Sequence, residues 1–138
     1  MRYIRWILFL CFLICFAGCA APAKSEESIW RVTAEDFAPA SDWPENDYTA
    51  QILKPESGQV EYINDWSSEG KFGVWLKDIS REESNRYVEQ LKDKGYQEIS
   101  QAENSVSVGT MLWKNEIYLS IAYSDDSLGI LIMTEQGR

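Results

Sequence analysis

Residues 80–95 read SREESNRYVEQLKDKG, and this stretch carries the start and stop signals of one helix. Ser80 followed by Glu83 is the capping-box pattern, in which each side chain satisfies a backbone N–H that the first helical turn leaves unpaired. Gly95 can adopt the left-handed conformation that ends many helices. The pattern therefore predicts a helix over 81–94.

The apolar side of this helix is narrow. Four residues recur there at helical spacing, and the remaining positions are mostly charged or polar. The four are Ser84, Tyr87, Val88 and Leu91. We therefore expect the helix to pack with one side against a sheet.

Alternation of apolar and other residues predicts strands on both sides of the helix. In the second strand, for example, Phe72, Val74 and Leu76 alternate with residues of the other face. The predicted strands span 59–66, 71–77, 106–113, 116–123 and 128–134. Short connections of hairpin type join neighbours, so the order ββαβββ indicates an α+β fold. We expect a single antiparallel sheet of about five strands with one helix packed across a face.

The composition argues against several classes of function. The 138 residues contain no histidine, which removes the usual general base of Ser-His and Cys-His sites and the commonest ligand of transition metals. Asp and Glu number 22 against 13 Lys and Arg, and the resulting net charge of -9 repels a phosphate backbone. We therefore expect no nucleic-acid partner, no metal site and no cofactor.

The first 19 residues hold all three cysteines and resemble a targeting segment. Two arginines precede an uninterrupted apolar run over 6–17, which is shorter than the roughly 20 residues of a membrane span. The run ends in FAGC at 16–19, which resembles the lipobox of bacterial lipoproteins. By this resemblance the leader 1–18 is removed and Cys19 becomes the first residue, carrying a thioether-linked diacylglycerol.

Two other interpretations of this segment stay open. An ordinary signal peptidase would cut near Cys19 and leave the thiol lost or free, and an uncleaved anchor would retain the leader. On the lipoprotein interpretation the chain divides into a signal peptide, 1–18, a lipidated cysteine with a tether, 19–41, and a globular α+β domain, 42–138. Trp30, Val32 and Phe37 are unusual in a spacer, so they either dock on the domain or belong to the tether.

A second resemblance begins with WPENDY at 43–48. With a later P-x-x-G at 55–58 and YVEQLKDKG at 87–95, it resembles a family of small uncharacterised lipoprotein domains of Gram-positive bacteria. The likeness covers about 43–123. It implies the same fold and the same lipid-anchored location, and it assigns neither an activity nor a catalytic residue.

Aromatic residues supply the candidate binding surface, which consists of Trp43, Tyr48, Trp75 and Tyr118. The interpretation that we favour for such side chains is structural, as core residues or as plugs at the open end of the sheet. Trp75 is out of phase with the apolar residues of its strand, so it is expected on the sheet face away from the helix. That face is either an exposed apolar patch or is covered by residues 30–55.

Two hypotheses of function follow from this pattern. The first is a non-catalytic interaction module, anchored by lipid to the cell membrane outside the cytoplasm, with an envelope protein as its partner. The alternative is a ligand-binding lipoprotein that stacks a cell-wall sugar or a peptide on exposed aromatic rings. Acidic residues cluster at 36–47 and 125–126 without calcium-loop spacing, so we interpret them as solvated and expect no enzyme.

Overall fold

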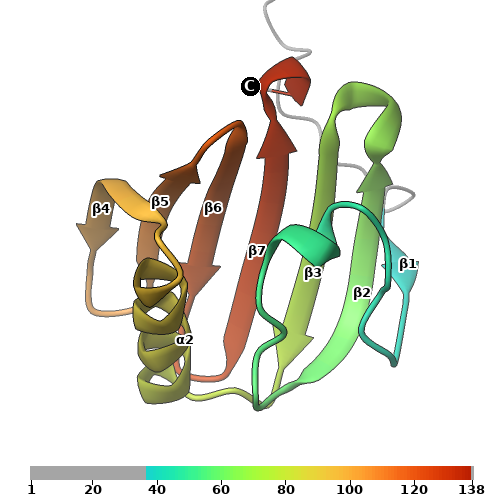
Figure 1. The fold of residues 1–138 in the computed structure, drawn as a ribbon. Helices are drawn as coiled ribbons and strands as arrows, with labels where there is room; N and C mark the ends of the chain where they lie inside the picture. Colours follow the sequence, from blue (N-terminus) through green and yellow to red (C-terminus); the bar gives the residue numbers. More distant parts are fainter. Residues whose placement is uncertain (1–36, 138) are drawn as a thin grey trace, which may run out of the picture. The chain divides into compact units, whose positions relative to one another are not determined.

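A seven-stranded antiparallel sheet organises residues 37–137, which are the residues that the structure, a computed structural model, describes (Figure 1). The strands are β1 (Ala38–Pro39), β2 (Gln59–Trp66), β3 (Lys71–Lys77), β4 (Gln97–Glu103), β5 (Val108–Lys114), β6 (Ile117–Tyr123) and β7 (Ser127–Thr134). They lie in the order β1-β2-β3-β7-β6-β5-β4. Helix α2 (Arg81–Asp93) connects β3 to β4 and lies across one face of the sheet (Figure 1).

The predicted α+β class with one antiparallel sheet and one helix is confirmed for the described residues, but the sheet has seven strands instead of about five. The two additional strands, β1 and β4, lie at the two edges of the sheet. β1 has two residues and lies within the stretch assigned to the tether. All seven residues of β4 are exposed, so its sequence, QEISQAE, lacks the alternation of apolar and polar residues that predicts a strand.

The capping box predicted at the start of α2 is present. The Glu83 N–H donates to Ser80 Oγ at 3.2 Å, and the Ser80 N–H donates to Glu83 Oε2 at 2.9 Å. The Ser80 Oγ also donates to Glu83 Oε2, at 2.7 Å, and the two hydrogen bonds from the Ser80 N–H and hydroxyl hold the pKa of the Glu83 carboxyl below its ordinary value. At the other end Gly95 has a φ of 95°, as expected of a residue that ends a helix.

The core lies between α2 and the sheet. Across the central strands Val74 pairs with Ile130, which in turn lies beside Ile121, so one row of fully buried side chains crosses β3, β7 and β6. The helix adds Tyr87, Val88 and Leu91, each at most 4% exposed.

Residues 43–57 cover the part of this face that α2 leaves open. Their turn lies on the same side of the sheet as the helix (Figure 1). The Tyr48 ring stacks on Phe72 of the core at 5.9 Å, and Leu53 also packs against the core. The alternative in which 30–55 cover the opposite face is therefore wrong for this stretch. Phe37 does lie on the opposite face, and residues 30–36 are outside the described range.

On the opposite face the Trp75 indole lies over two glycines. Gly129 is its partner on β7, and a Cβ built on Gly129 would approach the indole Nε1 to 2.9 Å. A Cβ on Gly73 would collide with the indole ring. Tyr62 stacks beside Trp75 with ring centroids 5.6 Å apart, and the Phe37 ring meets both edge-on.

The close approach of Trp75 predicts a difference between two glycine substitutions on this face. Gly73→Ala would force the indole out of place, and we expect it to lower the free energy of unfolding by about 1–3 kcal/mol, measured by urea denaturation. In the matched variant Gly109→Ala, the nearest atom to the new Cβ is a backbone oxygen at 4.0 Å. Gly109→Ala should leave stability unchanged or slightly raised, because glycine is unfavourable within a strand. Equal losses in both variants would contradict the packing described.

The capping box predicts a pH-dependent effect of Ser80→Ala. Loss of the cap should cost about 1 kcal/mol of stability near neutral pH. Because the folded state lowers the pKa of Glu83, the stabilisation is complete above the ordinary carboxyl pKa and is lost as the pH falls through the lowered pKa. Urea denaturation should therefore show a smaller difference from the unsubstituted chain at about pH 3 than at about pH 7. Ser68→Ala, at an exposed serine, is the control and should show no such trend.

Candidate functional site

The four candidate aromatic residues lie on two different faces of the sheet. Trp43 and Tyr48 belong to the segment that covers the helix side, and both pack against the core. Trp75 and Tyr118 belong to β3 and β6 and point to the opposite face, as their phase in the strands predicts. The structure therefore divides the four residues between the two faces of the sheet and does not bring them together as one surface.

Tyr48 and the WPENDY motif build a turn. Asn46 Oδ1 accepts hydrogen bonds from the backbone N–H groups of Tyr48 and Thr49, both at 3.0 Å. Thr49 Oγ1 donates to the Pro44 carbonyl at 2.7 Å, and Tyr48 Oη donates to the Ser67 carbonyl at 3.3 Å. Asparagine suits such a turn because its side chain can accept from the backbone that follows it. We assign Tyr48 a structural role.

Tyr118 is 9% exposed and lies beside Trp113, with ring centroids 6.5 Å apart. Trp75 is half-buried and sits within the aromatic cluster that it forms with Tyr62 and Phe37. Both side chains thus pack against aromatic neighbours, and only Trp75 keeps part of its surface exposed.

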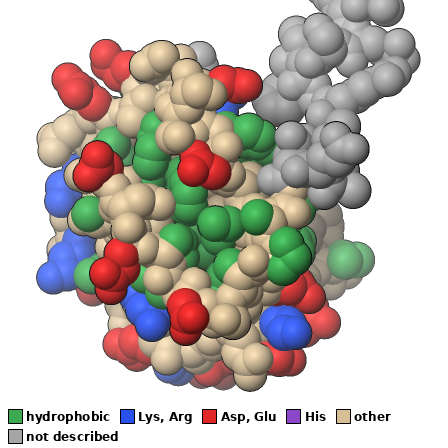
Figure 2. Space-filling view, turned by 90° about the vertical axis from the view of Figure 1, so that its right-hand side faces the viewer, with side chains coloured by type: hydrophobic (Ala, Val, Ile, Leu, Met, Phe, Trp, Pro, Cys, Tyr) green, Lys and Arg blue, Asp and Glu red, His purple; other side chains and the backbone are tan. Residues whose placement is uncertain are grey.

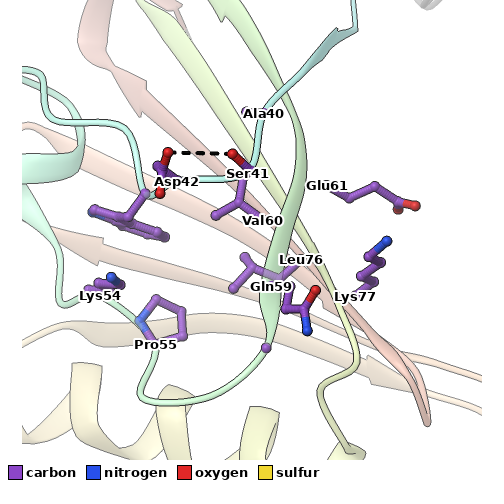
Figure 3. A pocket seen from close by; sticks show the side chains of 12 residues that line it. Ala40, Ser41, Asp42, Lys54, Pro55, Gln59, Val60, Glu61, Leu76 and Lys77 are labelled. Atoms are coloured by element: carbon purple, nitrogen blue, oxygen red, sulfur yellow. Dashed lines mark hydrogen bonds between the residues drawn. The ribbon is translucent and has the colours of Figure 1, made fainter.

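Trp43 lines a cleft at the β1–β2 edge of the sheet. The cleft has a volume of about 440 Å³ and forms where the chain turns away from the sheet after β1. The last backbone contact there is made by Ala40, whose N–H donates to the Glu61 carbonyl of β2 at 3.1 Å. In Figure 3, Asp42, Lys54 and Pro55 lie on one side of the cleft, and Gln59 and Val60 lie on the other.

Around the cleft, this side of the molecule has an apolar middle with charged side chains of both signs about it. Figure 2, which looks at the side of the molecule that bears β1, shows hydrophobic side chains gathered in the middle of this side with Asp and Glu around them. Val60 and Leu76 are the buried apolar residues that line the cleft, at 8% and 4% exposed. We name this feature the Trp43 cleft.

Two tyrosine hydroxyls hold the loop that forms one wall of the Trp43 cleft. Tyr87 Oη donates to the Leu53 carbonyl at 2.8 Å, and Tyr96 Oη donates to the Gln51 carbonyl at 3.0 Å. Burial raises the pKa of both hydroxyls, so both stay protonated and remain donors across the physiological range. The wall is thereby fixed to α2 through Tyr87 and, through Tyr96, to the turn between α2 and β4.

Exposed apolar side chains gather at the other edge of the sheet. Among the described residues, the large hydrophobic side chains that are exposed are Ile99, Val106 and Trp113, at 53%, 70% and 36%. All three belong to the hairpin of β4 and β5, and β4 has no strand on its outer side. We name this feature the β4–β5 surface. The amino-acid pattern did not reveal this surface, because the exposed residues of β4 show no alternation that would place a strand beside 106–113.

The β4 strand is tied to the helix by ion pairs. Lys92 Nζ lies 2.7 Å from Glu98 and 2.9 Å from Glu89, and these two carboxylates raise the pKa of Lys92. Arg81 reaches Glu103 at 3.6 Å and Asp125 at 3.3 Å. The acidic residues of this region therefore serve as partners of basic side chains in the fold.

No group of three or more His, Cys, Asp or Glu side chains within residues 37–137 is arranged to hold a metal ion. Cys19 and the remainder of the N-terminal segment lie outside the described range. Over that same range, no helix is both long enough and apolar enough to cross a membrane.

Comparisons of the chain with protein-family models, with curated proteins and with solved structures found no match. The resemblance of residues 16–19 to a lipobox therefore remains a prediction. The same holds for the resemblance of residues 43–123 to a lipoprotein domain family.

Proposed function

We propose that this protein is a lipoprotein of the cell envelope, anchored to the outer side of the cell membrane through Cys19. The observation that carries the proposal is the apolar run over 6–17 that closes in FAGC. A thioether-linked diacylglycerol supplies two acyl chains, and two chains suffice for stable anchoring. An acidic chain gains nothing from anionic lipid, so the anchor has to depend on its acyl chains.

The domain, on this proposal, is a non-catalytic interaction module whose partner is another envelope protein. The β4–β5 surface supports this role, since an edge strand with unpaired backbone beside exposed apolar side chains is suited to adding a strand. We therefore assign the partner an extended segment that pairs with β4 and covers Ile99 and Val106.

A second candidate function is the binding of a cell-wall ligand. The Trp43 cleft favours it, because a partly exposed indole lines a cleft whose volume lies within the usual range of ligand sites, about 300–1,000 Å³. The two functions use different edges of the sheet and are compatible with each other.

The lipid anchor predicts opposite results for two cysteine substitutions. Mass spectrometry of the native protein should find an N-terminal peptide that begins at Cys19 and carries a diacylglycerol. Cys19→Ala should abolish this modification and the membrane retention that depends on it. Cys15→Ala, four residues upstream in the leader, should leave both unchanged. A mature chain that begins with unmodified Ala20, or one that retains the leader, would contradict the proposal.

The β4–β5 surface predicts site-specific crosslinking in the intact envelope. A photo-crosslinking residue at Val106 should yield an adduct of one defined mass with another protein, because Val106 is 70% exposed at the proposed contact. The same group at Glu45, which is exposed in the turn near the opposite edge, is the control and should not yield that adduct. An adduct with twice the mass of this chain would show a second copy in the partner's place. That result, or equal labelling from both positions, would overturn the assignment.

A further inference from the structure

We infer that the Trp43 cleft binds one ring of an uncharged carbohydrate that bears an acetamido group. This inference rests on the ligand-binding function proposed above and names the ligand class. Three features of the cleft carry it, namely a fixed indole, an apolar floor and a rim of mixed polarity without excess charge.

The indole of Trp43 is held in place before any ligand arrives. Trp43 packs against the core with part of its surface and lines the cleft with another part. Pro44 follows it directly and restricts its backbone to extended conformations. A rigid aromatic surface of this kind loses little conformational entropy on binding and suits the flat apolar side of a sugar ring.

The rim of the cleft offers both kinds of hydrogen-bonding group. The Asp42 carboxylate accepts, the Lys54 ammonium donates, and the Gln59 amide does both. Ser41 Oγ donates a long hydrogen bond to Asp42 Oδ2, at 3.4 Å, and adds a hydroxyl to the rim. Sugar hydroxyls are donors and acceptors at once, so neighbouring hydroxyls can pair with unlike groups of this rim.

The charges of the lining argue for a neutral ligand. Two basic residues, Lys54 and Lys77, are balanced by two acidic residues, Asp42 and Glu61. The chain as a whole carries a net charge of -9, and its field would disfavour an anionic ligand at a site with no local excess of positive charge. Phosphate-bearing and acidic sugars are therefore poor candidates.

The floor of the cleft accounts for the acetamido group. Val60 and Leu76 are buried apolar residues that lie beside the amide-bearing Gln59 of β2. An acetamido group combines a methyl group, which can contact the apolar pair, with an amide, which can pair with Gln59. A sugar with only hydroxyls at that position would leave the apolar floor without a matching group.

The test is calorimetric titration of the full chain, in detergent, with the trimer of N-acetylglucosamine. We expect saturable binding, and we expect Trp43→Ala to raise the dissociation constant about tenfold or more through loss of the stacking surface. Gln59→Ala, at an exposed residue that leaves the core intact, should raise it about threefold to tenfold through loss of hydrogen bonds. The matched control Trp113→Ala removes an exposed indole at the far edge and should bind like the unsubstituted chain.

Several results would overturn the inference. These are an absence of binding up to about 10 mM trimer, equal affinity for the glucose trimer without acetamido groups, or unchanged binding in Gln59→Ala and in a folded Trp43→Ala. Saturable binding of a neutral tetrapeptide, with no response to the sugar, would assign the cleft to peptides. The result is separate from the anchor and the partner, since lipidation of Cys19 and crosslinking at Val106 have their own readouts.

Discussion

The seven-stranded sheet is wider than one helix can cover. Six inter-strand spacings give a sheet about 29 Å across, whereas a helix with its side chains is about 10–12 Å wide. Helix α2 therefore shields only part of the core face, and the apolar row through Val74 and Ile130 would otherwise meet water. The segment 43–57 supplies the second cover. The Asn46 turn, the tyrosine contacts and the Trp43 cleft all follow from this requirement.

The two covers act together because hydrogen bonds join them. A loop packed on a sheet has backbone carbonyls that lose water on burial and require donors. Tyr87 and Tyr96 donate to the carbonyls of Leu53 and Gln51, and burial keeps both hydroxyls protonated by raising the pKa of each. The same contacts hold the loop from which Lys54 and Pro55 line the cleft, so packing of the core also shapes the site.

The elements that face the core could be predicted from the sequence, because burial imposes a period that can be read. Helix α2 with its capping box and the strands β2 and β3 were predicted with almost the observed bounds. Strand β4 could not be predicted in this way, because an edge strand with no buried side chain shows no such period. Which face of the sheet residues 43–57 cover could not be predicted either. Periodicity tells which residues of a strand share a face, and it does not say where an irregular segment lies. Trp43 was found as a candidate through its proline neighbour, whereas Gln59 and Val106 carried no local signal.

The two proposed binding surfaces lie at opposite edges of the sheet. The chain joins the sheet at β1, beside the Trp43 cleft, and β4 is the strand farthest from that point. About five inter-strand spacings, or roughly 24 Å, separate β2 from β4. Two small ligands that far apart have no direct steric contact, and hydrogen-bonded strands lie between them. On the two proposals, a wall sugar at one edge and a protein strand at the other would therefore have room to bind at the same time, so that this domain would connect them.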